Sequence, residues 1–394
     1  MKILLYGCTY STWITYFIDN FLKKEDYDVW ILKTSNKEEY IQRFKEQGVH
    51  LIECPSKIMD WHDGKLKGNF FVILYIHYLQ VKTIVKSGKY DLINLHYVDI
   101  VDIVDVFLLK CLTKAKLLVS YWGDDLLRFT DRILHFLGIF AKHADYVTFD
   151  NDDLKIKFHK VYKWAEKANS ETVLFGLPIL DIIREKQNNV SGIEIRKKWE
   201  FPENKTIIAI GYNAIPQQQH IAVLNSIEKL ENEIKERIFI LLQMSYGYGG
   251  TEEYKKSVAD AAKKAGCQYK VIDSFLSDEE IADLRIVTDI FIHAQLTDAF
   301  SGSICENLFA GTILLNARWL RYQEFVDYNF KYLEFEEIDE VAQIIKEVLE
   351  HGFDVSGNSN LIWKLRSWDA CMPKWKRIYR KVLEKDEKDV GDRG

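Results

Sequence analysis

The stretch Phe291-Ile-His-Ala-Gln-Leu-Thr-Asp-Ala-Phe-Ser-Gly-Ser-Ile-Cys-Glu-Asn-Leu-Phe-Ala-Gly311 decides the fold of the second half of the chain. Its apolar start predicts a strand that ends near Ile292, and its end predicts a helix that begins near Ser303. Small residues between the two leave backbone N–H groups exposed at the positive end of the helix, which suits a diphosphate. Glu306 would then face a ribose on the same ligand, and Asp298 a polar group above the loop. The alternative, which the spacing leaves open, is that Ser303 caps the helix and Glu306 completes a capping box.

Outward from this stretch, short apolar runs alternate with segments long enough for helices. Runs of leucine and β-branched residues suit strands buried on both faces, and the alternation predicts parallel, doubly wound sheets. A polar segment at 185–204 interrupts the pattern. The sequence therefore predicts an α/β protein with two Rossmann-like domains, residues 1–185 and 186–355, then a C-terminal helical segment at 356–384 and a flexible tail at 385–394. The predicted strands are 3–6, 29–32, 49–52, 92–95, 117–121, 146–149, 173–175, 206–210, 238–242, 269–272, 289–292 and 312–315.

The composition excludes several classes of protein. Of the 394 residues 47% are hydrophobic and 28% charged, so packed cores are expected and disorder is excluded for most of the chain. The net charge of -6 argues against a nucleic-acid partner. The six cysteines form no CxxC pair, which excludes the common zinc patterns and fits a reducing compartment. No uncharged stretch reaches the ~20 residues that span a bilayer, so a cytoplasmic protein is expected, with attachment to a membrane surface left open.

The spacing Asp298-x7-Glu306, followed by Ala310-Gly311-Thr312, resembles the acid-x7-Glu signature of family-4 glycosyltransferases with the GT-B fold. Its flanks, and Arg366-Ser-Trp368 further on, resemble the same family in the same order. The resemblance implies an N-terminal acceptor domain and a C-terminal nucleotide-sugar donor domain that face a central cleft, with the C-terminal helix packing back on the N-terminal domain. It also implies that Glu306 holds the nucleotide ribose, that Asp298 contacts hydroxyls of the donor sugar, and that amides around Ser301–Ser303 hold the distal phosphate.

The sequence departs from that family after the first strand of the donor domain. Family-4 enzymes usually carry an Arg and a Lys there to neutralise the diphosphate, whereas residues 211–220 contain neither. The loss of two cations weakens a diphosphate site unless another group compensates. A second resemblance widens the donor range. Ser120–Leu126, Gly211–Asn213 and Leu242–Gly247 are similar to segments of bacterial 4-acetamido-fucosyl transferases, GT-B enzymes that combine a deoxythymidine-diphosphate sugar with lipid-linked acceptors.

Further candidates follow the ends of other predicted strands. The glycine-rich loop at 245–250 permits close approach of a ligand, and a plain turn explains it equally well. In Trp122-Gly-Asp-Asp125 the carboxylate of Asp124 is a candidate base, while one of the two acids caps the next helix. His96 ends a strand, where sites collect, and a packed core histidine is an equal alternative. The Ser/Thr-rich turn at 7–12 follows the first strand. It either faces the acceptor or is an ordinary cap of the next helix.

The predicted site residues fall into three groups, and no metal ligand is predicted. The catalytic residues are Asp298, Asp124 and Glu306. The donor-binding residues are Gly211, Asn213, Gln218, His220, Tyr246, Gly247, Ser301, Gly302, Ser303 and Glu306. The acceptor-binding residues are Tyr10, Ser11, His96, Trp122 and Gly123. Asp150-Asn-Asp152 resembles the DxD metal motif of the GT-A fold, but a strand end followed by a helix cap explains it as well.

Two segments bear on membrane contact. The segment 70–80 is apolar nearly all round and flanked by lysines, which fits a membrane-facing helix, but a helix buried between the sheet and its neighbours is favoured. The segment 126–144 mixes Arg128, Arg132 and Lys142 with aromatic and aliphatic residues. It is the better candidate to meet a lipid-linked acceptor.

Together these features predict a metal-independent glycosyltransferase of the hexosyltransferase type, without a cofactor. It would move a sugar from a nucleoside diphosphate sugar to a glycan or lipid-linked acceptor in bacterial surface polysaccharide synthesis, in the cytoplasm or at the inner face of the plasma membrane. The choice between retaining and inverting chemistry stays open. The alternatives are a nucleotide-sugar 2-epimerase of the same fold and a non-catalytic partner subunit.

Overall fold

The structure is a computed structural model that describes residues 1–384 apart from 128, 248 and 299; the side chain of Asp124 also lies outside the description. The predicted tail at 385–394 is therefore outside the described residues. The chain divides into two compact units. Unit 1 comprises residues 1–176 together with the C-terminal helix that begins at Trp368, and unit 2 comprises Leu177–Ser367.

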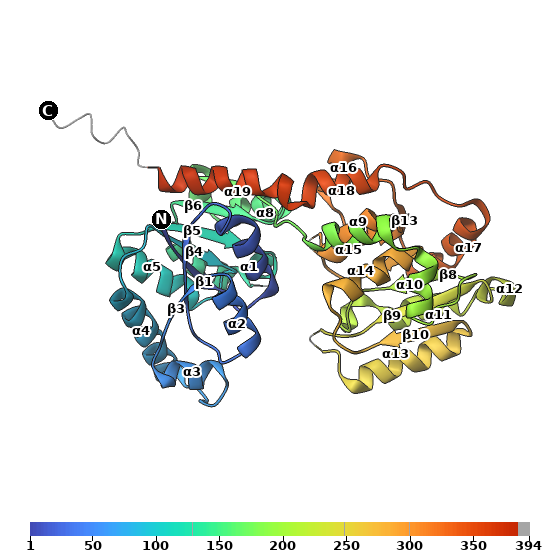
Figure 1. Ribbon diagram of the computed structural model, residues 1–394, viewed down its shortest axis with the longest axis horizontal. Coiled ribbons are helices and arrows are strands. Elements are labelled where there is room, and N and C mark those ends of the chain that lie inside the picture. The colour runs from blue at the N-terminus through green and yellow to red at the C-terminus, as the bar shows by residue number, and fades with distance from the viewer. Residues whose placement is uncertain (128, 248, 299, 385–394) are drawn as a thin grey trace. The chain divides into compact units, whose positions relative to one another are not determined.

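Unit 1 is built on a seven-stranded parallel sheet in the order β3-β2-β1-β4-β5-β6-β7 (Figure 1). Its central strands are buried on both faces, and most of their buried residues are leucine, isoleucine or valine. The predicted strand at 173–175 is wrong, since the last strand ends at Thr172. The strands are β1 (Lys2–Gly7), β2 (Asp28–Leu32), β3 (His50–Ile52), β4 (Leu92–His96), β5 (Lys116–Tyr121), β6 (Tyr146–Phe149) and β7 (Ser170–Thr172).

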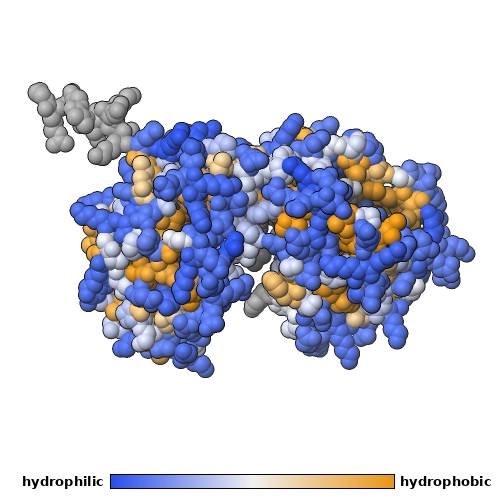
Figure 2. Space-filling view, in the orientation of Figure 1, coloured by the Kyte–Doolittle hydropathy of each residue, from blue (hydrophilic) through white to orange (hydrophobic). Residues whose placement is uncertain are grey.

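Helices cover both faces of this sheet and bury two separate apolar clusters. One cluster lies under α4, α5, α7 and α8, and the other under α1, η1, α2 and α19. Figure 2 shows hydrophobic patches between the hydrophilic side chains that cover most of the visible surface. The helices of unit 1 are α1 (Thr12–Phe17), η1 (Ile18–Leu22), α2 (Glu38–Glu46), α3 (Ser56–His62), α4 (Phe70–Ser87), α5 (Asp102–Thr113), α6 (Asp124–Leu127), α7 (Asp131–Ala141), α8 (Asp152–Val161), η2 (Lys163–Lys167) and α19 (Trp368–Leu383).

The C-terminal helix α19 completes the second of these clusters. The ring of Trp375 lies 4.8 Å from that of Phe17, and its indole N–H donates to the Leu174 carbonyl at 3.0 Å. Asn94 on β4 donates to the Tyr379 hydroxyl at 2.8 Å. The predicted return of the C-terminal helix to the N-terminal domain is confirmed.

Unit 2 repeats the architecture with a six-stranded parallel sheet in the order β10-β9-β8-β11-β12-β13. Its last strand, β13, was not predicted because it is a single short run. The strands are β8 (Thr206–Ile210), β9 (Ile238–Gln243), β10 (Gln268–Ile272), β11 (Ile290–His293), β12 (Ile313–Ala317) and β13 (Leu333–Phe335). The helices are α9 (Ile179–Asn189), α10 (Gly192–Lys198), η3 (Pro216–Gln218), α11 (His220–Ile227), α12 (Asn232–Lys235), α13 (Glu252–Ala265), α14 (Asp278–Val287), α15 (Gly302–Ala310), α16 (Gln323–Tyr328), η4 (Ile338–Glu340), α17 (Val341–His351) and α18 (Asn358–Arg366).

The boundaries between the units differ in position from the predicted domain boundaries. The division at 185/186 falls inside α9, which belongs to unit 2 as a whole. The segment 356–384 forms two helices, α18 in unit 2 and α19 in unit 1, which separate at Ser367. The two doubly wound parallel sheets themselves agree with the predicted fold class.

Candidate active site

The candidate donor residues gather at one edge of the unit 2 sheet. The strand order reverses between β8 and β11, which lie side by side, and ligands of open α/β sheets bind outside the carboxyl ends of the strands at such a reversal. The loops after β8, β9 and β11 carry most of the predicted donor residues, and the start of α15 carries the rest. All of them belong to unit 2.

The carboxylate of Asp298 is buried and is fixed by groups of its own unit. Its Oδ2 accepts hydrogen bonds from the Ser301 amide at 2.9 Å and from the Tyr322 hydroxyl at 2.8 Å, and its Oδ1 accepts one from the Tyr212 hydroxyl at 3.3 Å. His293 Nε2 lies 3.7 Å from Oδ2. Burial alone would raise the pKa of Asp298, but these partners, His293 first, outweigh it and lower the pKa. An ionised Asp298 therefore anchors the turn into α15.

A buried arginine that sequence analysis missed lies beside Glu306. Arg285 on α14 donates from Nε to Glu306 Oε2 at 3.0 Å and from Nη1 to Gln243 Oε1 at 3.1 Å. The Arg285 and Glu306 side chains are only 6% and 14% exposed. The pair joins α14 to α15, and the bond to Gln243 ties it to the end of β9. No spacing rule links two residues on different helices, so the sequence carried no signal for this pair.

Helix α15 begins one residue before the predicted start, at Gly302, and its N-cap is Ser301. The capping-box alternative is wrong, because Ser303 lies inside the helix and Glu306 is bound to Arg285. The buried hydroxyl of Ser303 has no hydrogen-bond partner among the described residues. This hydroxyl and the first N–H groups of α15 form a set of donors that suits an anion.

The loop after β8 places its polar side chains in the protein interior. Asn213, Gln218 and His220 are at most 3% exposed. Gln218 Nε2 donates to Gln295 Oε1 at 2.8 Å, and the Tyr254 hydroxyl lies 3.0 Å from His220 Nδ1. Burial lowers the pKa of His220 to about 4, so its ring is neutral. These side chains fix the loop, and their predicted contact with a donor stays a prediction.

Gly211 lets the loop after β8 fold closely on itself, and Gly247 lets the loop after β9 approach that loop. Gly211 has a φ of +62°, and a Cβ there would lie 2.9 Å from Gln218 Oε1. Gly247 has a φ of +134°, and a Cβ there would lie 2.7 Å from Ile215. The Ala214 amide donates to the Tyr246 carbonyl at 2.6 Å and joins the two loops. Tyr246 itself is 54% exposed at this edge.

The predicted acceptor residues lie at the carboxyl edge of the unit 1 sheet. His96 is fully buried among the rings of Phe17, Trp122 and Phe175, and burial lowers its pKa to about 3. Both of its ring nitrogens are without a partner among the described residues. His96 is thus a neutral packed histidine, in line with the alternative that the sequence left open.

The remaining acceptor candidates lie on the turns after β1 and β5. Ser11 is the N-cap of α1, and Tyr10 packs its ring against Phe44 at 5.5 Å. Trp122 and Gly123 precede α6, and both of their amides donate to the Asp125 carboxylate.

Asp125 also accepts the Val98 amide at 3.0 Å, so it is the structural acid of the Asp124-Asp125 pair. Asp124 begins α6, and its side chain lies outside the described residues.

The Asp150-Asn-Asp152 segment is part of a helix start. Asn151 caps α8 by accepting the Leu154 amide at 2.9 Å, and Asp152 accepts a hydrogen bond from the Thr172 hydroxyl. This agrees with the cap alternative. Across the described part of the chain, no group of three or more His, Cys, Asp or Glu side chains is arranged to hold a metal ion.

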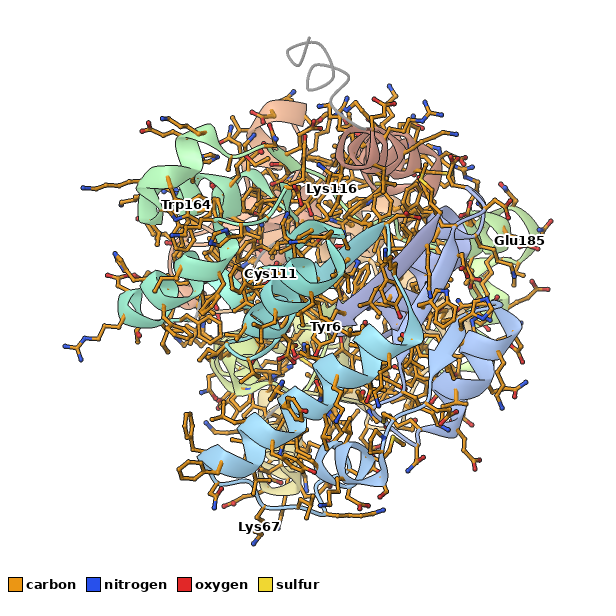
Figure 3. The ribbon with its side chains drawn as sticks, turned by 90° about the vertical axis from the view of Figure 1, so that its left-hand side faces the viewer. Tyr6, Lys67, Cys111, Lys116, Trp164 and Glu185 are labelled. Atoms are coloured by element: carbon orange, nitrogen blue, oxygen red, sulfur yellow. The ribbon has the colours of Figure 1, made fainter. Side chains whose placement is uncertain are left out.

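A network of buried polar side chains under α4 and α5 was also not identified from the sequence. Asp105 Oδ2 accepts from the Tyr6 hydroxyl at 2.6 Å and lies 2.6 Å from His77 Nδ1, and Gln80 lies 2.8 Å from the same hydroxyl. Figure 3 labels Tyr6 among the side chains of this region. Burial, helped by neighbouring acids, raises the pKa of Asp102 at the start of α5 to about 7. The sequence signal was the run of aspartates at 99, 102 and 105. Such an acid exchanges its proton near neutral pH.

Comparison with known proteins finds one family model and solved structures of the same fold. Residues 2–151 match the model of a family described as Glycosyl transferase 4-like. A search of curated proteins gave no match.

Solved structures of the same fold include a glycosyltransferase from Rickettsia africae, with a TM-score of 0.76 at 14% identity over 98% of this chain and 99% of that one. HepE of Anabaena in complex with UDP and glucose has a TM-score of 0.69 at 15% identity over 97% and 100% of the two chains. Sucrose-phosphate synthase from Thermosynechococcus elongatus has a TM-score of 0.72 at 12% identity over 97% and 98%. The predicted GT-B fold and the likeness to family-4 glycosyltransferases are confirmed.

Proposed function

We propose that this chain, a GT-B-fold protein with a glycosyl transferase 4-like N-terminal region, is a glycosyltransferase that moves a sugar from a nucleoside diphosphate sugar to a glycan or lipid-linked acceptor in bacterial surface polysaccharide synthesis. The observation that carries the proposal is the pair of fixed carboxylates, Asp298 and Glu306, on either side of the N-terminus of α15. The matches to glycosyltransferases support the reaction class. The acceptor and the biosynthetic role rest on the sequence resemblance.

In this proposal α15 binds the diphosphate. Its first N–H groups and the Ser303 hydroxyl stabilise the negative charge that grows on the leaving group as the bond from C1 of the sugar to the phosphate oxygen breaks. Glu306 keeps Oε1 for a pentose hydroxyl while Arg285 holds Oε2. Donation by backbone and hydroxyl groups needs no metal ion, in keeping with the metal-independent chemistry predicted from the sequence.

The non-catalytic alternative draws on the absence of an Arg/Lys pair in the β8 loop. Arg285 supplies a buried guanidinium that is hydrogen-bonded to Glu306, and the charges of these two side chains balance each other. In this proposal the first N–H groups of α15 and the Ser303 hydroxyl therefore remain the groups that stabilise the diphosphate. The UDP and glucose in the HepE structure make UDP-sugars the first donors to test, and deoxythymidine-diphosphate sugars follow from the second resemblance.

The acceptor hydroxyl attacks C1 of the sugar and loses its proton as the diphosphate leaves. If the reaction inverts the anomeric centre, Asp124 remains the candidate base. The acidic group at Asp102 is a second candidate on the same edge of unit 1, because its raised pKa suits proton exchange near neutral pH. If the reaction retains the anomeric centre, the donor phosphate itself takes the proton.

Helix α4 supports peripheral membrane contact. The favoured prediction of a helix buried between the sheet and its neighbours holds for one face only, which carries the buried Ile76 and Ile84. On the exposed face, at the start of the helix, Phe70 is 68% and Phe71 77% exposed. Lysines flank this apolar face: Lys57 lies over the Tyr75 ring and Lys82 over the Tyr78 ring. Aromatic side chains beside lysines suit the interface of an anionic lipid layer. No helix in the described part of the chain is long and apolar enough to cross a bilayer.

Calorimetry with UDP, dTDP and GDP tests the donor site. We expect wild-type protein to bind at least one of them, and Glu306→Gln to weaken that binding about tenfold or more, because a charged acceptor is lost. Glu233→Gln, at an exposed position on α12, is the matched control and should bind as wild type does. No binding at millimolar concentration, or equal binding by Glu306→Gln, would contradict the site.

Product analysis separates transfer from the alternatives. Release of free nucleoside diphosphate only after an acceptor is added supports transfer. Conversion of one sugar nucleotide into another without release supports a 2-epimerase.

A further inference from the structure

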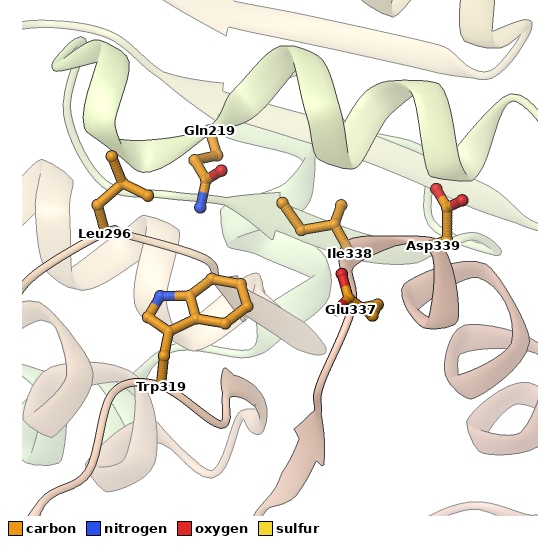
Figure 4. A pocket seen from close by; sticks show the side chains of 6 residues that line it. All are labelled: Gln219, Leu296, Trp319, Glu337, Ile338 and Asp339. Atoms are coloured by element: carbon orange, nitrogen blue, oxygen red, sulfur yellow. The ribbon is translucent and has the colours of Figure 1, made fainter.

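A cavity opens at the same edge of the unit 2 sheet as the donor loops, on the side of β11, β12 and β13. It has a volume of about 520 Å³ and is lined by Gln219, Leu296, Trp319, Glu337, Ile338 and Asp339 (Figure 4). Each of these residues follows the carboxyl end of one of four neighbouring strands, β8, β11, β12 or β13. The volume falls in the range of about 300–1,000 Å³ that is typical of small-molecule sites.

The indole of Trp319 forms a fixed platform in this cavity. Its Nε1 donates to the Gln295 carbonyl at 2.8 Å, and its ring packs edge to face against Phe335 with centroids 5.7 Å apart. The side chain nevertheless stays 40% exposed, and Leu296 beside it is 53% exposed. An aromatic face that is held in place and left open attracts the weakly positive C–H groups of a ligand.

Hydrogen-bonding groups surround this platform from two sides. Figure 4 shows the amide of Gln219 directed toward the space above Trp319, with Glu337 just below Ile338 in this view and Asp339 farther from Trp319 than either. The amide nitrogen of Gln219 is held by the Ala294 carbonyl at 2.6 Å. The η4 segment is fixed to α11 because the buried Ser226 hydroxyl donates to the Asp339 carbonyl at 3.2 Å.

The charged side chains of the cavity favour a neutral ligand over an anion. Glu337 and Asp339 contribute two carboxylates, and Lys229 balances one of them at 2.8 Å from Asp339. The remaining negative charge disfavours phosphate and other anions, so this cavity differs from the donor site at α15. Carboxylate oxygens accept hydrogen bonds from hydroxyl groups, and an aromatic face binds the C–H side of a pyranose ring.

We propose that this cavity is a binding subsite for a neutral sugar ring of a glycan, with the ring stacked on Trp319 and its hydroxyls bonded to Glu337 and Gln219. The subsite goes beyond the proposed function, because it binds sugar without a nucleotide. It would hold one residue of a glycan chain close to the donor loops, since Gln219 and Leu296 belong to the loops after β8 and β11.

The test follows the indole N–H signal of Trp319 by NMR in the full-length protein, assigned with Trp319→Phe. The probes are maltotetraose, chitotetraose and mannotetraose, each titrated to millimolar concentration without nucleotide. We expect at least one of them to shift this signal in a saturable way. We expect Trp319→Ala to weaken binding of that sugar about tenfold or more by calorimetry, and Trp319→Phe to retain most of it.

A second pair of variants tests the subsite without changing Trp319, in case the Trp319→Ala variant does not fold. Leu296→Asn alters the exposed rim of the cavity and should weaken sugar binding, whereas Val326→Asn, at a 73% exposed position on α16, should not. No saturable shift with any probe, or equal weakening by both asparagine variants, overturns the subsite. Failure of nucleoside diphosphates to bind while the sugar still binds overturns the proposed function alone.

Discussion

At the scale of single residues, the pairing of Arg285 with Glu306 shapes the donor site. Arg285 is buried and Glu306 is largely buried, so each partner helps the other to remain charged where water solvates ions poorly. The same carboxylate is assigned to the pentose of the donor. Stability and donor binding are therefore coupled through one pair of side chains.

Arg285→Gln should lower the free energy of unfolding of the unit that contains it by about 3–5 kcal/mol, because it leaves the Glu306 carboxylate buried without its partner. The double variant Arg285→Gln/Glu306→Gln should recover much of that loss, since neither charge remains. Urea unfolding followed by circular dichroism measures both. Strictly additive effects of the two substitutions would contradict the coupling.

His96 predicts a pH dependence with a defined sign. Its folded-state pKa is about 3, while an unfolded histidine titrates near 6.5. Between these values the unfolded chain binds one more proton, so stability should fall as the pH drops through this window. His96→Asn should show a shallower fall over the same range in unfolding experiments at a series of pH values. An unchanged slope would mean that His96 is not held neutral.

At the scale of elements, α4 and α7 each expose apolar side chains that are candidates for contact with a lipid layer. The sequence favoured the segment that contains α7 as the site of lipid contact. In the structure, the exposed side chains of Phe70 and Phe71 favour α4 instead. On α7, Phe136 is 42% and Ile139 53% exposed. The two helices can therefore be tested against each other.

Phe70→Asp/Phe71→Asp should reduce binding to vesicles of phosphatidylglycerol and phosphatidylcholine about tenfold or more, because burial of each phenylalanine contributes about 1.5–3 kcal/mol. Phe136→Asp/Ile139→Asp on α7 is the matched comparison and should reduce binding less. Sedimentation with vesicles measures both. A larger loss in the α7 variant would return the lipid contact to the segment that the sequence favoured.

Much of this architecture could be predicted from the sequence, for physical reasons. Central strands such as β8 and β11 are nearly continuous apolar runs, and the junction before α15 has the small residues that a strand-to-helix turn needs. The partner of Glu306 could not be predicted, because Arg285 reaches it only after α14 and α15 have packed. The exposure of α4 was missed for a related reason: an apolar helix has the same composition whether its outer face is covered or open.

At the scale of the whole molecule, unit 2 is one continuous segment while unit 1 is made of two. All the predicted donor residues lie in unit 2. The core of unit 1, in contrast, needs α19, because Trp375 and Tyr379 fill the space around Phe17 and Phe21.

Residues 177–367 expressed alone should therefore fold and bind the nucleoside diphosphate that the full chain binds. Residues 1–176 alone should fail to fold, because the apolar face beneath α19 is left open to water. Dispersed amide signals in NMR and calorimetry decide both points. A folded 177–367 segment that does not bind the nucleotide would contradict the assignment of the donor site to this unit.

The late position of α19 in the chain also determines the order in which the two units can fold during translation. A ribosome releases the strands of unit 1 first, yet the helix that closes their core emerges only after all of unit 2 has been made. Unit 2 can complete its fold while still tethered to the ribosome, whereas the nascent N-terminal region must wait with Phe17 and Phe21 uncovered. During translation, this region is where we expect chaperones to bind.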